Sequence, residues 1–269
     1  MGIPKWLGDT FGLQSDVSRS LVLGNLYGLV YFHLQDDLVD GDISQENQLP
    51  AIHLRTILYQ NWLTEYVRLF EPSSMFWSQF ALFMAQWERA TARSNTQPEI
   101  SFQAYVNRNY LELAERAAPL KICCVATCLL TQREHLIANL TNALDHLHVA
   151  SVLLDHACDW LEDLEMGRYN TFIHYVSETP QVLSNYELNR RLVYEELWMG
   201  AAASPYFDLA IHHLDCATEM IETVECFELL EYVRLFKQNL DAYEEQMVQN
   251  AKDALHQATI HIFGTLSQG

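Results

Sequence analysis

The sequence predicts an all-α protein, and three observations favour this fold class. Apolar residues recur at spacings of three and four along almost the whole chain, which is the period of an amphipathic helix. No Asn-Gly or Asp-Gly pair sits between segments of alternating polarity, where a β-hairpin would place it. The 10 glycines and 7 prolines fall mainly between the periodic segments, which suits long helices.

The order of the helices follows from the breaks in this periodicity. Polar stretches, several of them containing Gly or Pro, interrupt it at GDISQENQLP, EPSS, RSNTQPE, ETPQ and AAASP. Helices are expected at residues 15–40, 50–70, 73–94, 101–130, 132–167, 184–200, 205–224 and 226–262. No break resembles a long flexible linker and no internal repeat is evident, so residues 1–269 are expected to form a single domain.

The composition argues against several kinds of binding partner and against a membrane-spanning segment. A formal net charge of -19 argues against nucleic acid or an anionic membrane as the main partner. The opening MGIPKWLGDTFGL lacks the basic and long apolar regions of a signal peptide. The longest apolar stretch, residues 21–34, is shorter than the roughly 20 residues that span a bilayer. We therefore expect a cytoplasmic protein with no integral membrane segment, whose six cysteines are reduced and mostly buried.

The first acidic cluster ends an apolar run with the sequence QDDLVD. On a helix, Asp36 and Asp40 project from the same face with Asp37 beside them. Like charges one turn apart repel, and carboxylates beside an apolar surface need a counter-charge. Mg²⁺ takes oxygen ligands and keeps open positions for phosphate oxygens, so the cluster fits a magnesium site. A solvated acidic helix end is the alternative.

The second cluster lies in LLDHACDWLEDLEMGRYNTF. Asp155, Asp159 and Asp163 follow at intervals of four, so on a helix they form a slowly turning ladder. The residues between them are largely apolar, as expected of a helix packed inside a bundle, and an inward-facing ladder of like charges would require cations. A solvated acidic face is again the alternative. If the two clusters face each other across a bundle, they can clamp metal ions and a diphosphate between them.

These two motifs carry a resemblance to a known superfamily. DDLVD resembles the DDxxD motif of class I isoprenoid synthases. DWLEDLEMGRYNTF is similar to the D-x-x-x-D-x-x-x-G-R motif of the squalene and phytoene synthase branch, matched here by Asp159, Asp163, Gly167 and Arg168. The motifs and their order cover much of residues 20–175, whereas the C-terminal third matches only in helical character.

The resemblance implies a fold and a chemistry. The fold would be a single helical bundle around a deep apolar pocket, the class I isoprenoid synthase fold. Mg²⁺ held by both motifs would bind a prenyl diphosphate and draw off its diphosphate, leaving an allylic carbocation in a dry cavity. Bundles of this family often pair, which leaves a homodimer open. The implied catalytic residues are Asp36, Asp37, Asp159 and Asp163, and the implied metal ligands are Asp36, Asp37, Asp40, Asp155, Asp159 and Asp163.

Two arginines are candidates for binding the diphosphate. Arg168 follows Gly167, a glycine suited to ending a helix, and it either binds diphosphate or pairs with a neighbouring acid. Pro119 has no N–H and should break the helix around NYLELAERAAPLKICC. Class I terpene cyclases resemble this arrangement, with a broken helix that carries a diphosphate-sensing arginine, and Arg116 would be that residue. A structural kink with a surface arginine is the alternative. Weaker candidates for the pocket mouth are Arg108, Lys121, Arg234 and Lys237.

Aromatic side chains suit a carbocation pathway, because each ring face stabilises a cation by roughly 0.5–2 kcal/mol. The chain has 13 Tyr, 12 Phe and 6 Trp, most of which we expect in the ordinary core. Tyr27, Tyr31 and Phe32 stand one or two turns ahead of Asp36 and are the preferred lining residues of the pocket.

Two positions at which the sequence differs from the family pattern indicate which of the family's reactions to expect. Lys5 is isolated near the N-terminus, which argues against chain elongation, and Cys158 stands where squalene and phytoene synthases usually carry arginine. The expected activity is therefore that of a class I terpene synthase, a carbon–oxygen lyase that ionises a C15–C25 prenyl diphosphate, C20 favoured, and cyclises or rearranges the cation. The alternatives are head-to-head prenyl condensation and a non-catalytic all-α binding protein.

Overall fold

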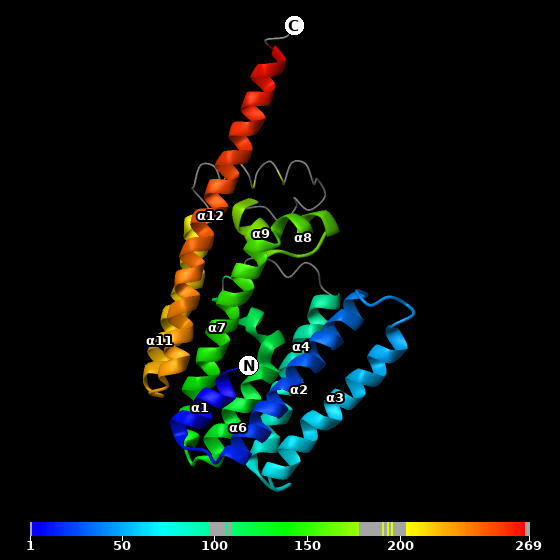
Figure 1. Ribbon diagram of the computed structural model, residues 1–269, viewed down its shortest axis with the longest axis vertical. Helices are drawn as coiled ribbons and strands as arrows, with labels where there is room; N and C mark the ends of the chain where they lie inside the picture. The colour runs from blue at the N-terminus through cyan, green and yellow to red at the C-terminus, as the bar shows by residue number, and fades with distance from the viewer. Residues whose placement is uncertain are drawn as a thin grey trace. The chain divides into compact units, whose positions relative to one another are not determined.

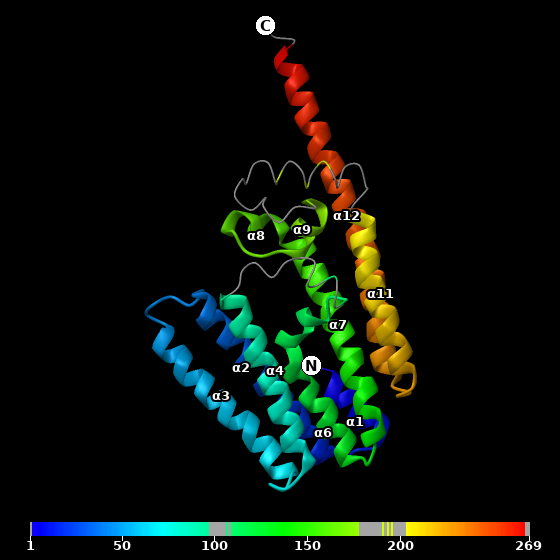
Figure 2. The ribbon, with the colours of Figure 1, turned by 180° about the vertical axis from the view of Figure 1, so that it is seen from behind.

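The computed structural model describes residues 2–96, 106, 109–177, 190, 193, 195 and 203–266, and every regular element in these residues is a helix (Figures 1 and 2). The all-α prediction is thereby confirmed. No helix within these residues is long and apolar enough to cross a membrane. The chain divides into two compact units: unit 1 comprises Met1–Ala92, Glu115–Asp145 and Glu219–Leu230, and unit 2 comprises Arg93–Ala114, His146–Thr218 and Glu231–Gly269. The expectation of a single domain over residues 1–269 stays a prediction.

Unit 1 contains the N-terminal helices and the first acidic motif. Its elements are α1 (Ile3–Phe11), α2 (Ser15–Asp40), α3 (Gln48–Leu69), the larger part of α4 (Met75–Thr96), most of the 3-10 helix η1 (Leu111–Lys121), α6 (Ile122–Leu130), the 3-10 helix η2 (Glu134–Leu136) and the start of α7 (Ile137–Cys158). The helix predicted at 15–40 coincides with α2, and those predicted at 50–70 and 73–94 agree with α3 and α4 within two residues. The short α1 was not predicted.

Two predicted helices are interrupted in the structure. In place of one helix over 101–130, the 3-10 helix η1 contains Pro119 and passes directly into α6. Proline removes an N–H and its ring clashes with the preceding turn of an α-helix. Pro119 lies inside η1, and the chain changes from 3-10 to α-helix two residues after it without a break. In place of one helix over 132–167, η2 and α7 are followed by α8 (Trp160–Met166), with Asp159 between α7 and α8.

Helices α2 and α3 pack side by side through glycine (Figures 1 and 2). Gly24 and Gly28, one turn apart, are buried on the face of α2 that meets α3. A Cβ on Gly28 would stand 2.9 Å from Nε1 of Trp62, whereas one on Gly24 would stand 3.4 Å from the ring of Tyr66. The glycines therefore let the indole of Trp62, which is 2% exposed, lie directly against the α2 backbone.

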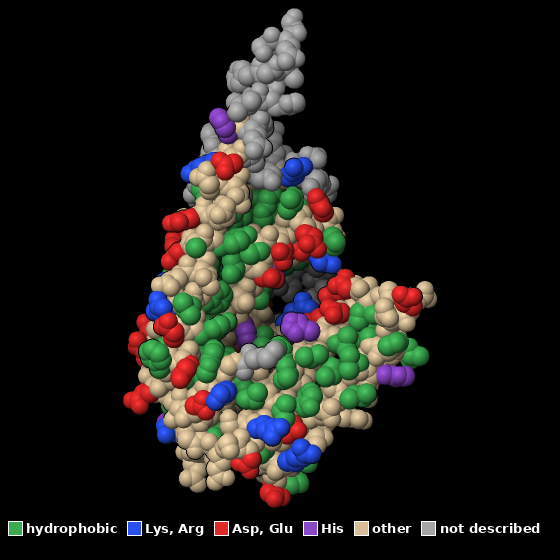
Figure 3. Space-filling view, viewed as in Figure 1, with side chains coloured by type: hydrophobic (Ala, Val, Ile, Leu, Met, Phe, Trp, Pro, Cys, Tyr) green, Lys and Arg blue, Asp and Glu red, His purple; other side chains and the backbone are tan. Residues whose placement is uncertain are grey.

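The core of unit 1 is largely aromatic. Phe70 and Phe76 stack with ring centroids 4.1 Å apart, and Trp62 contacts Phe80 at 5.0 Å. On the face of α3 that points away from this core, aliphatic side chains are exposed. Figure 3 shows hydrophobic side chains on the surface over α2 and α3. The buried members of this core are Leu21, Trp62, Tyr66, Phe70, Phe76, Phe80, Phe83, Ala118, Ile122, Val125 and Ala126.

Unit 2 contains the second acidic motif. Its elements are the C-terminal half of α7, α8, α9 (Thr171–Ser177), most of α11 (Ala203–Glu222) and α12 (Phe227–Leu266) from Glu231 onward. The last two agree with the helices predicted at 205–224 and 226–262, and α9 was not predicted. Apart from residues 190, 193 and 195, the helix predicted at 184–200 lies outside the described residues.

Candidate functional site

The first acidic motif occupies the C-terminal end of α2. The N–H of Gly41, at φ 81°, bonds to the carbonyl of Asp37 and ends the helix just after Asp40. Asp36 is half-buried, whereas Asp37 and Asp40 are exposed. The C-terminus of a helix carries partial negative charge, so each carboxylate there is unfavourable by about 0.3–1 kcal/mol, and no basic residue of α2 lies in the last turn to offset it. The end of α2 therefore favours a cation.

Arg116 is the cation that the structure places at this end. Its Nη2 lies 3.7 Å from Oδ1 of Asp36, and the two side chains are 49% and 38% exposed. Desolvation raises the pKa of the Asp36 carboxyl; Arg116 lowers it, and Asp40 and Asp37 raise it further. A half-exposed ion pair contributes at most about 1 kcal/mol, so this one constrains the fold little. Arg116 lies on the 3-10 helix η1, three residues before Pro119, and its role toward diphosphate stays a prediction.

A second arginine near α2 was missed. Arg55 of α3 donates a hydrogen bond from Nη1 to Oε1 of Gln35, 2.7 Å away, immediately before the acidic motif. Burial raises the pKa of the Tyr31 hydroxyl, and the Arg55 charge lowers it, so the guanidinium also acts on this ring. The signal in the sequence was weak: Arg55 is one of only 16 basic residues, but nothing local places it beside Gln35.

The three aromatic residues predicted to line a pocket are partly buried in unit 1. Phe32 contacts Trp62 at 5.4 Å and Trp87 at 5.0 Å between ring centroids, and Tyr31 contacts Phe32 at 4.9 Å. Tyr27 packs on the same core. These contacts make them part of an aromatic cluster just before the acidic end of α2, and their role as lining residues stays a prediction.

The second acidic motif spans the junction of α7 and α8. The N–H of Asp159 bonds to the carbonyl of Asp155, and that of Asp163 to the carbonyl of Asp159, each at 2.9 Å. Asp159 itself lies between the two helices with φ -101° and ψ 8°, so the helix is interrupted within the motif. The charges of Asp159 and Asp163 both act on Asp155, so the three carboxylates still lie near one another. Asp155 and Asp159 are exposed and Asp163 is half-buried, which agrees with the alternative of a solvated acidic face for the first two. The role of the three carboxylates as metal ligands stays a prediction.

The ladder still carries mutual repulsion. Although Asp155 is exposed, neighbouring atoms displace enough water to raise the pKa of its carboxyl, and the negative charges of Asp159 and Asp163 raise it further. The ladder is therefore a place where an added cation lowers the electrostatic energy.

The end of the motif is set by glycine, as predicted. Gly167 has φ 67° and ends α8, and the N–H of Arg168 bonds to the carbonyl of Asp163 at 2.8 Å. The side chain of Arg168 is exposed. Its binding of diphosphate stays a prediction.

Sequence reasoning missed the buried support beneath this motif. Nδ2 of Asn170 donates to Oδ2 of Asp163 and to the carbonyl of His156, both at 2.8 Å. Thr171 contacts Nδ1 of His156 at 2.7 Å and the hydroxyl of Tyr206 at 2.8 Å. The signal was present in part, because Asn before an apolar run is an N-cap residue, but the run YNTF was not recognised as a helix start.

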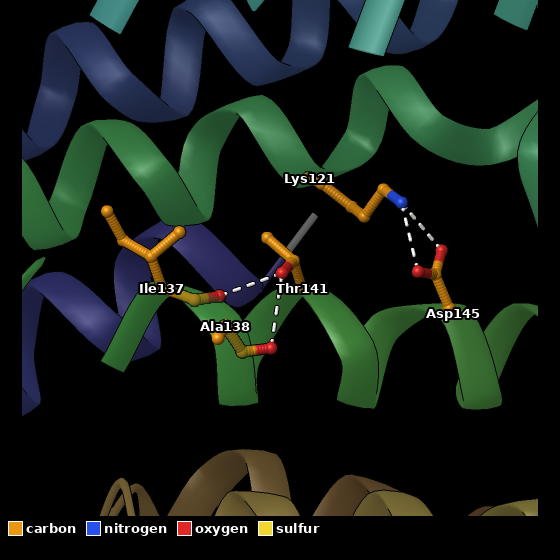
Figure 4. A network of polar contacts seen from close by, with 5 residues as sticks. All are labelled: Lys121, Ile137, Ala138, Thr141 and Asp145. Carbon is orange, nitrogen blue, oxygen red and sulfur yellow. Dashed lines mark hydrogen bonds and ion pairs between the residues drawn. The ribbon is translucent and has the colours of Figure 1, made fainter. Parts of the chain in front are cut away.

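A hollow of about 470 Å³ lies between α4 and α7 in unit 1. Nζ of Lys121 lies within it, 2.7 and 3.0 Å from the carboxylate oxygens of Asp145, and Thr141 donates to the carbonyls of Ile137 and Ala138 (Figure 4). Its lining is mixed and partly charged. It is lined by Lys121, one of the weaker candidates, but by none of the predicted aspartates, diphosphate-binding arginines or aromatic residues, and the deep apolar pocket stays a prediction.

The weaker basic candidates fare as follows. Lys121 is buried against Asp145, Arg234 pairs with Glu231 of its own helix, and Lys237 pairs with Asp215. Arg108 lies outside the described residues.

The structure thus brings together the predicted residues in two groups. Asp36, Asp37, Asp40 and Arg116 belong to unit 1, and the ladder ending at Asp163 belongs to unit 2. The meeting of the groups around shared metal ions stays a prediction. Among the described residues, no group of three or more His, Cys, Asp or Glu side chains is arranged to hold a metal ion. Comparison of the chain with known protein families finds no match, and comparison with curated proteins finds none either.

Proposed function

We propose that this protein is a Mg²⁺-dependent class I terpene synthase, which ionises a prenyl diphosphate of C15–C25, C20 favoured, and cyclises or rearranges the resulting cation. The observation that carries the proposal is the placement of Arg116, on a 3-10 helix that contains Pro119, beside the Asp36 carboxylate at the end of α2. An acidic motif and an arginine on a broken helix are the two parts that the resemblance pairs for diphosphate recognition.

The type of ligand in both motifs suits magnesium. Each motif offers carboxylate oxygens from residues four apart in the chain, and hard oxygen ligands are those that Mg²⁺ prefers. When bound, the metal would supply Lewis-acid neutralisation of the departing diphosphate. Asp36, Asp37 and Asp40 would hold it in unit 1, and Asp155, Asp159 and Asp163 would hold it in unit 2.

The chain's own residues would share the remaining work. Arg116 would exchange its Asp36 partner for a diphosphate oxygen, at small cost because the ion pair is half-exposed. Tyr31 and Phe32 would present ring faces to the positive charge of the carbocation. Arg168, exposed beyond Gly167, would give a second charge-assisted hydrogen bond to the diphosphate.

The test is turnover by purified protein. Incubation with C10, C15, C20 and C25 prenyl diphosphates, with and without Mg²⁺, should release pyrophosphate and give hydrocarbon or alcohol products by gas chromatography and mass spectrometry. Asp36→Asn and Arg116→Gln should each lower kcat/KM by at least about tenfold, since each removes a charge from the transition state. Arg68→Gln is the matched control, because Arg68 is exposed and pairs with Glu65 of its own helix. Absence of pyrophosphate release from every substrate would refute the proposal.

Head-to-head condensation is the second candidate, favoured by the match of Asp159, Asp163, Gly167 and Arg168 to the squalene and phytoene synthase motif. A product with twice the carbon number of the substrate would establish it. The exposure of Asp155 and Asp159 supports the non-catalytic alternative, in which Asp159→Ala leaves the free energy of unfolding unchanged or higher and no Mg²⁺-dependent bisphosphonate binding occurs.

A further inference from the structure

We propose that Asn170 is a positioning residue for Asp163, holding one carboxylate oxygen of Asp163 so that the other is presented to a divalent cation with oxygen preference, such as Mg²⁺ or Mn²⁺. This inference rests on the proposed function in that it takes Asp163 as a metal ligand. It adds a residue that lies outside the acidic motif.

Asn170 is fully buried, and its side chain makes four hydrogen bonds. Nδ2 donates to Oδ2 of Asp163 and to the carbonyl of His156, both at 2.8 Å. Oδ1 accepts from the backbone N–H groups of Phe172 and Ile173, at 2.9 and 3.1 Å. The reverse amide orientation would set donors against donors and an acceptor against two acceptors, so the partners themselves fix which atom faces Asp163.

The amide is anchored on two elements that do not include Asp163. The carbonyl of His156 belongs to α7, and Phe172 and Ile173 form the first turn of α9. A further chain of hydrogen bonds fastens α9 in place: Thr171 contacts both His156 and the hydroxyl of Tyr206, which donates to the carbonyl of Leu153 at 3.0 Å. The Asp163 carboxylate is thus tied to a buried scaffold.

A neutral amide suits this task. A lysine or arginine at the same place would neutralise Asp163 and compete with a metal ion for it, whereas the Asn170 amide orients the carboxylate and leaves its full negative charge. Buried partners that hydrogen-bond metal-ligating carboxylates fix their orientation, and removing such partners costs about 10–100-fold in metal affinity. The bond to Oδ2 leaves Oδ1 of Asp163 as the ligand.

The experiment compares cation binding by wild-type protein, Asn170→Ser and Asn139→Ser. Serine is as good an N-cap as asparagine, so α9 keeps its cap while Asp163 loses its donor. Asn139 is the matched control, because its Nδ2 donates to the hydroxyl of Thr223 in unit 1 and the substitution is the same. Binding of Mn²⁺ is measured by electron paramagnetic resonance with inorganic pyrophosphate, which requires no turnover.

Asn170→Ser should weaken Mn²⁺ binding by about 10–100-fold, and Asn139→Ser should leave it within about twofold. Turnover by Asn170→Ser should recover at high Mg²⁺, whereas Asp163→Asn should not recover. A purely structural role would lower the melting temperature of Asn170→Ser without changing the dissociation constant of the folded protein, and that result would overturn the inference.

A measurement on the wild-type protein avoids dependence on the folding of the variant. The side-chain amide resonances of ¹⁵N-labelled Asn170 should shift during Mg²⁺ titration with the midpoint of cation binding, and unshifted resonances at saturation would overturn the inference. Cation binding without turnover of any prenyl diphosphate would refute the proposed function alone. Turnover with the same Mg²⁺ requirement in Asn170→Ser would refute the role of Asn170 alone. No cation binding by the wild-type protein would refute both.

Discussion

A buried histidine pair in unit 2 makes the stability of the protein depend on pH. Nδ1 of His213 lies 2.8 Å from Nδ1 of His146, and His213 is fully buried. Burial, together with the neighbouring His146 and His212, lowers the pKa of His213 to about 4. One of the two Nδ1 atoms must be unprotonated to accept the hydrogen bond, and the lowered pKa makes His213 a ring that stays neutral in the folded state.

The sign and size of the effect follow from the lowered pKa. Below the unfolded value of about 6.5, the unfolded chain takes up a proton that the folded chain refuses, so stability falls as the pH drops from about 6.5 to about 4. Each pKa unit corresponds to 1.36 kcal/mol, so His213 should remove about 2 kcal/mol between pH 7.5 and pH 5, and about 3 kcal/mol once pH 4 is reached.

The assay is urea unfolding followed by circular dichroism from pH 7.5 to pH 5, for wild-type protein and His213→Asn. The asparagine amide occupies the place of Nδ1 but has no charge to gain, so the variant should lose about 2 kcal/mol less than the wild type over this range. Asp36 and Asp155, whose raised pKa values act with the opposite sign, are present in both proteins and cancel in the difference. Parallel pH profiles for the two proteins would refute the reasoning.

Two further predictions concern packing and charge in unit 1. Gly24→Ala should raise the free energy of unfolding by up to about 1 kcal/mol through helix propensity. Gly28→Ala, whose Cβ would meet the buried Trp62 at 2.9 Å, should be less stable than Gly24→Ala by about 1–3 kcal/mol in urea unfolding, and equal stabilities would show that the α2–α3 contact is looser than described. Lys121→Met, which leaves the partly buried Asp145 without this cation, should cost about 2–4 kcal/mol by thermal or urea unfolding. Most of that loss should return in Lys121→Met/Asp145→Leu, and a double variant no more stable than the single one would contradict the assignment of the cost to the Asp145 charge left without Lys121.

The long helices were predictable because their apolar residues repeat at spacings of three and four over many turns and so mark one face of each helix. The bounds of α2 were predicted to the residue, since Gly41 ends it where the pattern stops. The short α1 and α9 were missed because seven to nine residues hold too few turns for a period to stand out, although Pro4 at the start of α1 and Asn170 before α9 are typical start signals.

The candidate site was predictable in its acids and only partly in its partners. Asp36 and Asp163 were identified because carboxylates four apart stand out against an apolar background. The burial of each carboxylate could not be predicted from the sequence, and Asp155 and Asp159 are exposed in the structure. Arg55 and Asn170 were missed, because each acts through a hydrogen bond to a residue that no local pattern places beside it.

The sequence by itself determined the helical class and the ends of helices at Gly41 and Gly167. These features depend on hydrogen bonds between residues three to five apart, and such bonds are governed by neighbouring side chains. Only the tertiary structure decided that Arg116 meets Asp36 and that Asn170 holds Asp163. Those contacts depend on how buried surfaces fit together in three dimensions, where many arrangements satisfy the same apolar pattern and side-chain volumes select one of them.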